Sequence, residues 1–218
     1  IIMINFQVIV EKLPVIFPLA GVTIKIAVVA MFVGLVLGLA TALFRFYNLV
    51  VLNKLSELYV FIIRGTPLLV QIYIVYFGLP RIGVEFGAFS SAYLALGINT
   101  GAYLSEVFRG AIKSVDKGQL EAALSVGMSY WQAMRRIILP QAVLVALPTI
   151  GNTFINLIKN TSLVFVISIE EIMAKTKKLA ALHGNYLEMY IAAAVVYLII
   201  FFVAYKGQEL LENHLDRG

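Results

Sequence analysis

Residues 15–44 read VIFPLAGVTIKIAVVAMFVGLVLGLATALF, an apolar run that only Lys25 interrupts and that ends at Arg45. A helix needs about 20 such residues to cross the hydrocarbon core of a bilayer. Lys25 lies near one end of the run, from where its long side chain can reach the membrane interface. This stretch therefore predicts a helix that spans a membrane.

The composition of the whole chain supports the same interpretation. Of the 218 residues, 61% are hydrophobic and 13% are charged, whereas soluble domains have about half and a quarter. One water-soluble core of this size cannot bury so much apolar surface. The composition excludes a soluble enzyme, a disordered protein and a nucleic-acid binder. We expect an all-α integral membrane protein that forms a single transmembrane domain over residues 1–218.

Further apolar runs predict about five spans in all. The other four cover residues 58–79, 86–105, 137–158 and 189–205. The second run carries Arg64-Gly65-Thr66-Pro67 near its start. This segment either kinks the span and gates it, or is a basic anchor followed by an ordinary proline. Residues 163–169 are too few to span, so we expect a bent continuation of the fourth helix or a re-entrant segment.

The basic residues predict the orientation of the chain. The net charge is +5, and the loops and span ends on one side carry ten Lys and Arg while those on the other carry five. Basic residues collect on the cytoplasmic side, so we place the N-terminus outside and the C-terminus in the cytoplasm. Lys175, Lys177 and Lys178 oppose this trend. Together with Glu170 and Glu171 they are expected to form a solvated outer face, or one that a binding protein touches.

Residues 113–140, KSVDKGQLEAALSVGMSYWQAMRRIILP, form an unusually ordered loop between two spans. Apolar residues recur at helical spacing on both sides of Gly127. Gly127 is suited to a left-handed turn, and Ser129 can cap the helix that follows. The pattern predicts a cytoplasmic helix-turn-helix, which either docks a soluble partner or lies on the bilayer.

This loop resembles the EAA loop of bacterial ABC importer permeases. Glu121-Ala122-Ala123, Gly127, Ile137 and Leu139-Pro140 match every signature position. RGTPLLVQ at 64–71, NTGAYLSEVFRGAI at 99–112, LPQA at 139–142 and KNTSLV at 159–164 resemble the polar amino acid uptake subfamily. The resemblance covers about residues 15–210. Two positions depart from the usual pattern: Asp116 replaces a common proline, and Asn160 replaces a common aspartate.

The resemblance implies a permease that imports a polar amino acid, basic ones included, by alternating access in the prokaryotic cytoplasmic membrane. The chain has no G-x-x-x-x-G-K-[ST] loop to hold phosphates, so it is not itself catalytic and binds no cofactor. ATP and Mg²⁺ would be held by two ATP-binding partner subunits. A second permease chain, the same or similar, and an extracytoplasmic solute-binding protein complete the implied assembly. Glu121, Ala122, Ala123 and Gly127 would seat in a groove of the ATPase.

Polar residues inside the predicted spans are the candidates for the substrate pathway, because such groups are costly in a bilayer. The candidates are Gln71, Asn99, Tyr103, Glu106, Asn156, Lys159, Asn160 and Ser162. Glu106 could meet a substrate ammonium or guanidinium, or could pair with Arg109 one helical turn away. Lys159 and Ser162 could meet a carboxylate. The asparagines and serines could instead only join neighbouring helices.

Two other classes of function compete with this prediction. An ion-coupled carrier or passive channel for a small polar solute explains the hydrophobicity and the polar residues, but not the ordered loop. A membrane enzyme has less support, because the sequence contains no H-E-x-x-H and no nucleophile–base motif. Association with an ATPase would separate the importer from both.

Overall fold

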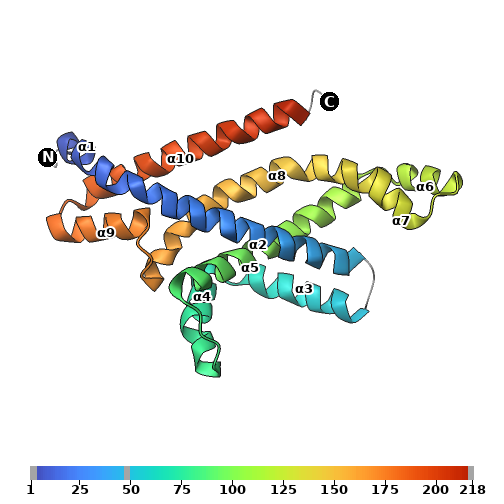
Figure 1. The fold of residues 1–218 in the computed structure, drawn as a ribbon, viewed down its shortest axis with the longest axis horizontal. Helices are drawn as coiled ribbons and strands as arrows, with labels where there is room; N and C mark the ends of the chain where they lie inside the picture. The colour runs from blue at the N-terminus through green and yellow to red at the C-terminus, as the bar shows by residue number, and fades with distance from the viewer. Residues whose placement is uncertain (1–3, 47–49, 216–218) are drawn as a thin grey trace.

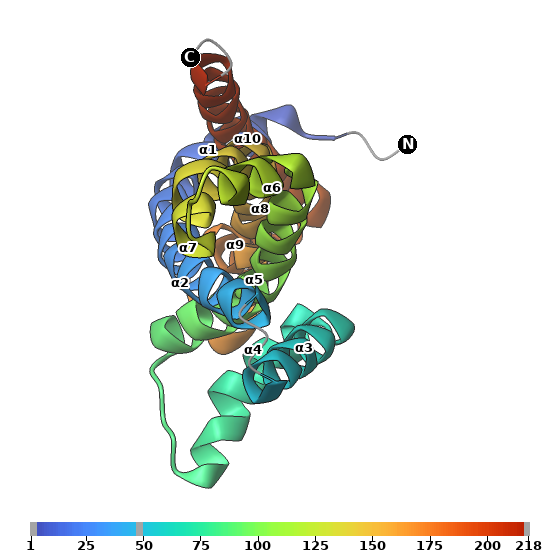
Figure 2. The same cartoon turned by 90° about the vertical axis from the view of Figure 1, so that its right-hand side faces the viewer.

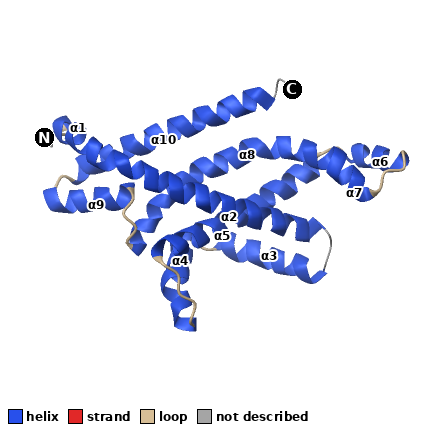
Figure 3. Cartoon of the chain, in the orientation of Figure 1, coloured by secondary structure: helices blue, strands red, loops and turns tan. Residues whose placement is uncertain are grey.

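A computed structural model describes residues 4–46 and 50–215, which form helices and the turns between them, with no strand in this part of the chain (Figure 3). The helices are α1 (Phe6–Ile16), α2 (Ala20–Phe46), α3 (Val50–Gly65), α4 (Leu68–Tyr73), α5 (Ala88–Ser114), α6 (Lys117–Ser125), α7 (Tyr130–Ala133), α8 (Leu139–Asn160), α9 (Ile172–His183) and α10 (Tyr186–Leu215). Short 3₁₀ or π turns join several of them: η1 (Phe17–Leu19), η2 (Ile74–Gly78), η3 (Leu79–Ile82), η4 (Met134–Ile138) and η5 (Thr161–Ile167).

The long helices run roughly along one axis of the molecule (Figure 1). The N-terminus lies at one end of this axis, near α9, and the C-terminus lies toward the other end, where α6 and α7 also project. That the two termini lie on opposite sides of a membrane stays a prediction.

Within residues 4–46 and 50–215, three helical segments are long and apolar enough to cross a membrane: Phe6–Arg45, Tyr130–Ile167 and Tyr186–His214. They contain the first, fourth and fifth predicted spans. A fourth is reached only if Val50–Gly65 and Leu68–Ile82, bent by 109°, count as one broken span. The span predicted over residues 58–79 is broken at Gly65 and Pro67, which agrees with the alternative that this segment kinks the span. The structure thus supports three or four membrane spans in the described residues, where the sequence predicted about five.

The third predicted span is α5, which lies inside the bundle. At 27 residues it is long enough to cross a membrane, but it is less apolar than the three segments above. It buries twelve of its residues, Ser91, Asn99, Thr100 and Ser105 among them. Polar side chains are tolerated there because neighbouring helices, rather than lipid, surround them.

Glycines allow α2 and α5 to pack closely. A Cβ added at Gly38 would lie 2.8 Å from Cβ of Leu104 and 3.0 Å from the carbonyl oxygen of Gly101, and one added at Gly97 would lie 2.5 Å from Cγ1 of Val33. Small residues at such contacts let two backbones approach within a membrane. In this chain the small-residue faces serve packing within the bundle.

The ordered loop folds as predicted, as two short helices joined by a tight turn. The side chain of Asp116 caps α6 by accepting a hydrogen bond from the Gly118 N–H at 2.7 Å. Gly127 adopts a φ of +86° after α6. Ser129 caps α7 in a reciprocal capping box with Gln132. The helix then continues through η4 into α8 and on through η5, ending at Ser168. Residues 163–169 thus include the tight continuation of the fourth span.

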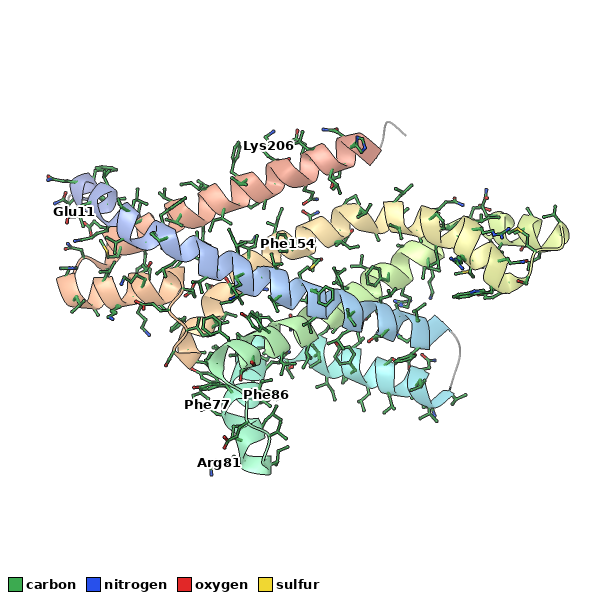
Figure 4. The ribbon with its side chains drawn as sticks, viewed as in Figure 1. Glu11, Phe77, Arg81, Phe86, Phe154 and Lys206 are labelled. Carbon is green, nitrogen blue, oxygen red and sulfur yellow. The ribbon has the colours of Figure 1, made fainter. Side chains whose placement is uncertain are left out.

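The segment from α3 through η3, residues 50–82, forms an arm beside the bundle. In Figure 2 the segment from α3 through α4 lies outside the group formed by α2, α5 and α8. Figure 4 places Arg81 near the tip of this arm and Phe77 closer to the bundle. Tyr59 in α3 ties the arm to the bundle by donating a hydrogen bond from its hydroxyl to the Ile98 carbonyl oxygen of α5 at 2.6 Å.

Candidate functional site

The break between α3 and α4 is held by one buried side chain. Nε2 of Gln71 donates to the carbonyl oxygens of Ile63 at 2.8 Å and Thr66 at 3.1 Å, and lies 3.0 Å from Oγ1 of Thr66. These carbonyls lie where Gly65 and Pro67 interrupt the helix, so they lack the usual partners within it. Gln71 therefore braces the bend, and it is only 7% exposed.

Gln71 also connects the bend to α5. Its Oε1 accepts a hydrogen bond from Nδ2 of Asn99 at 3.1 Å. Nε2 of Gln71 faces carbonyl oxygens and must be the donor, so its other amide atom is the acceptor. This fixes the orientation of Asn99: its nitrogen points to Gln71, and its Oδ1 has no partner within residues 4–46 and 50–215.

A polar cavity of about 680 Å³ lies beside this network. The break of the arm, α5, α8 and η5 all contribute to its walls. The lining residues are Thr66, Pro67, Leu68, Asn99, Thr100, Tyr103, Thr153, Asn156, Leu157, Lys159, Asn160 and Leu163. The volume falls within the range of about 300–1,000 Å³ typical of small-molecule sites.

The structure brings five of the eight predicted pathway residues to this cavity: Asn99, Tyr103, Asn156, Lys159 and Asn160. Gln71 lies behind the wall as a brace. Glu106 and Ser162 do not line it. Thr100 and Thr153, which also line the cavity, are further polar residues of the predicted spans, and Thr66 and Pro67 belong to the predicted kink. The apolar lining residues Leu68, Leu157 and Leu163 were not predicted. The Gly65–Pro67 interruption was the available signal, since a broken helix inside a membrane is tolerated mainly where it lines a cavity.

Lys159 is the only charged residue among those that line the cavity. It is exposed in the single chain, and no acidic residue in the described part of the chain lies within ion-pair distance of it. An unpaired ammonium cannot face lipid at low cost. Lys159 is therefore directed to water, to a ligand or to a further chain.

Glu106 forms ion pairs with two arginines. One carboxylate oxygen meets Arg45 of α2, and the other accepts from Nε of Arg109 at 3.1 Å and also contacts its Nη2. The sequence-based alternative of an Arg109 pair is confirmed, with Arg45 as an additional partner. The prediction that Glu106 meets a substrate ammonium is not supported, because Glu106 lines a different hollow, with Glu57 and Arg64.

Tyr103 separates the cavity from this charged hollow, since it lines both. The guanidinium carbon of Arg64 lies 5.2 Å from the centre of the Tyr103 ring, within the range of a cation–π contact. Arg64 thus joins the arm to α5 on the far side of the cavity wall.

The loop presents three of its four predicted coupling residues on the surface. Glu121, Ala122 and Gly127 are exposed. Ala123 is 3% exposed, and its carbonyl oxygen accepts from the Met128 N–H at 3.1 Å, closing the turn. Its small side chain lets the two loop helices pack, so Ala123 supports the shape of the loop from inside and does not offer its side chain to a partner.

Glu171 differs from the solvated acid that the sequence suggested. It is 0% exposed, its Oε1 accepts from the Ala174 N–H at 2.8 Å at the start of α9, and its Oε2 accepts from the Tyr197 hydroxyl at 2.9 Å. Burial raises the pKa of Glu171, against the hydrogen bonds that it accepts. Within the described residues no group of three His, Cys, Asp or Glu side chains could hold a metal ion.

Comparisons with known proteins agree on one family. Residues 13–217 match the model described as "Binding-protein-dependent transport system inner membrane component". The chain is similar to the probable amino-acid ABC transporter permease protein YckA of Bacillus subtilis (strain 168), at 41% identity over 96% of this chain and 92% of that one. It is also similar to the L-cystine transport system permease protein TcyB of the same organism, at 41% identity over 89% and 84% of the two chains.

A solved structure matches both fold and sequence. It is described as "Crystal structure of an amino acid ABC transporter with histidines", and it superposes with a TM-score of 0.91 at 34% identity over 98% of this chain and 100% of that one. Another, of the MetNI methionine ABC transporter in inward-facing conformations, has a TM-score of 0.74 at 17% identity over 89% and 93% of the two chains. This second match supports the fold alone.

Proposed function

The chain belongs to the family of binding-protein-dependent transport system inner membrane components, and from this premise we propose that it carries a polar amino acid into the cell. It is the transmembrane component of an ABC transporter and not the catalytic one. The proposed substrate class follows from two similar permeases, one named as a probable amino-acid permease and the other as an L-cystine permease.

One observation carries the proposal: a polar cavity lies at a broken helix among apolar helices. Amide, hydroxyl and ammonium groups converge there. A zwitterionic substrate needs donors for its carboxylate and acceptors for its ammonium. The cavity offers both, with Lys159 as a charged partner for the carboxylate and Asn99 as a carbonyl acceptor.

A continuous helical segment supports coupling between this cavity and an ATPase. Tyr130–Ile167 begins in the loop and ends beyond Asn160. We infer that α6, which packs against η4 near the start of this segment, passes a push on the exposed Glu121–Gly127 surface to the cavity wall. We infer that closure of two ATP-binding subunits tilts this segment and moves the opening of the cavity from one side of the membrane to the other.

The exposed face of α8 supports a second permease chain. Asn152, Asn156, Lys159 and Asn160 are all exposed in the single chain, although α8 lies within a membrane-crossing segment. A polar stripe of this kind disfavours contact with lipid. We propose that a second copy or a similar chain faces it across the pathway, that a solute-binding protein docks outside, and that the C-terminus lies in the cytoplasm.

The test is uptake into liposomes that contain the chain with its ATPase, with the binding protein outside and ATP inside. We expect ATP-dependent accumulation of one group of labelled amino acids. Flux without ATP would contradict the proposal in favour of a carrier or channel. Accumulation of no amino acid by a complex that hydrolyses ATP would contradict the substrate class.

Loop variants sharpen this test. Gly127→Asp places a side chain at a φ of +86° on the exposed turn and should abolish ATPase association or coupled uptake. Gly21→Ala is the control, because a Cβ at Gly21 meets nothing within 4 Å and should leave uptake unchanged. Normal uptake by the Gly127→Asp variant would show that the loop is not the coupling element.

A further inference from the structure

We propose that the transported amino acid has a neutral or acidic side chain, and that cationic amino acids are excluded by the charge of the cavity. This inference rests on the proposed function and specifies the substrate class of the same site. It goes against the sequence-based inclusion of basic amino acids, which depended on Glu106.

The walls of the cavity carry a net positive charge. The lining residues contain one ammonium, that of Lys159, and no carboxylate. A second cation placed near Lys159 would be repelled, and a low-dielectric surrounding strengthens that repulsion. The α-carboxylate of a substrate can pair with Lys159, and its α-ammonium then leaves the loaded site with one net positive charge. An acidic side chain would remove this charge, whereas lysine or arginine would add a second one.

The acid nearest to the cavity along α5, Glu106, is already neutralised. Glu106 lies one helical turn beyond the lining residue Tyr103, yet both of its oxygens contact arginines, Arg45 and Arg109. The adjacent Arg64, which stacks on Tyr103, adds positive charge outside the wall. The other acid nearby, Glu57, lines the hollow on the far side of Tyr103 together with Arg64, so the cavity walls offer no anion to a guanidinium or a side-chain ammonium.

The cavity offers hydrogen-bond acceptors to the α-ammonium that every amino acid has. The brace of Gln71 holds the nitrogen of Asn99 away, so Oδ1 of Asn99 remains as an acceptor. An amide oxygen and nearby hydroxyls can accept hydrogen bonds from the α-ammonium of the substrate. They do not balance a second, remote cation.

The binding protein must be left out of the test, because it could select the substrate before the permease does. We would measure binding of labelled glutamine, cystine, glutamate, arginine and lysine to the permease–ATPase complex in nanodiscs. At least one of the first three should bind, with arginine and lysine at least about tenfold weaker. Equal or tighter binding of arginine or lysine would overturn the inference and leave the proposed function intact. Binding of none, by a complex that hydrolyses ATP, would overturn both.

A single substitution provides a second test. Asn160→Asp adds a carboxylate next to Lys159 in the cavity and should raise arginine affinity by about tenfold while weakening glutamate. Asn53→Asp makes the same change in a different hollow, with Arg45, Arg109 and Lys113, and should not alter the selectivity. If Asn160→Asp still binds the wild-type substrate but gains no affinity for arginine, the charge of the cavity does not set the substrate class.

Discussion

At the scale of single residues, Gln71 organises the site without lining it. Its amide meets two main-chain carbonyls at the helix break and Nδ2 of Asn99 on α5. A buried acceptor that loses its donor costs about 1–3 kcal/mol. The shape of the cavity therefore depends on a side chain that stands behind its wall.

Gln71→Leu keeps a similar volume and removes every one of these hydrogen bonds. We expect the free energy of unfolding to fall by about 1–3 kcal/mol and substrate binding to weaken, because Asn99 loses its fixed orientation. Thermal unfolding and ligand binding of the detergent-solubilised complex would measure both. Gln141→Leu is the control: Gln141 is exposed and donates to the carbonyl of Ile137 within its own helix at 2.9 Å. Equal losses in the two variants would show that the brace has no special role.

Glu171 makes stability depend on pH. Burial raises its pKa in the folded chain above the value of about 4.3 for an exposed glutamate. The folded state then binds the proton more tightly than the unfolded state, so this contribution to stability is full below the unfolded pKa and is lost as pH rises through the folded pKa.

Glu171→Gln stays neutral at every pH and keeps an oxygen to cap α9. We expect the wild type to lose stability relative to this variant as pH rises from about 4 to about 8. Unfolding midpoints of both proteins across that range would show it. Parallel curves would mean that the hydrogen bonds from Ala174 and Tyr197 cancel the cost of burial.

At the scale of elements, the pairing of α2 with α5 depends on backbone approach. At Gly38 a Cβ would meet main-chain atoms, the Gly101 oxygen at 3.0 Å and the Ser105 nitrogen at 3.2 Å. Main-chain atoms cannot rotate away as a flexible side chain can, so the two helices would have to separate.

Gly38→Ala should therefore destabilise the chain by about 1–3 kcal/mol, as measured by the thermal midpoint of the purified complex. Gly21→Ala lies on the same helix with nothing near its Cβ, so it should be neutral or slightly stabilising. A neutral Gly38→Ala would contradict the close contact.

The sequence predicted elements well where the signal was local. Asp116, Gly127 and Ser129 marked the ends of the loop helices through their own capping chemistry. The apolar run over 15–44 marked α2. The 109° bend was foreseen only as one alternative, because a Gly-Thr-Pro segment does not show whether a helix kinks or turns away.

Properties that depend on contacts between distant parts of the chain were harder to predict from the sequence. Five cavity residues could be named from polarity inside apolar runs, but nothing local distinguished Asn99, on the wall, from Gln71 behind it. The sequence predicted that Glu106 binds substrate or pairs with Arg109. It did not predict the second ion pair of Glu106, because Arg45 is distant in sequence. The burial of Glu171 depends on α10 folding back beside α9, which the pattern around residue 171 does not encode.

At the scale of the whole molecule, three functional regions are arranged along the long axis: the α9 end, the cavity and the α6–α7 end. α9 lies toward one end of the molecule and α6 and α7 lie at the other (Figure 1). The cavity is lined by residues of α5 and α8, which run between these ends. The arrangement suits a path from an outer docking face to an inner ATPase. It requires that α9 be outside and the loop inside, which the excess of basic residues favours but Lys175, Lys177 and Lys178 oppose.

Labelling of single cysteines would decide this orientation. The natural chain has no cysteine, so Ser125→Cys on the loop and Lys178→Cys on α9 each create one unique, exposed thiol. A membrane-impermeant maleimide should label the Lys178 variant in right-side-out vesicles and the Ser125 variant only in inverted ones. The reverse pattern would place the loop outside, where no ATPase could reach it, and would contradict the importer orientation. Lysing the vesicles before labelling is the control, since both thiols should then react.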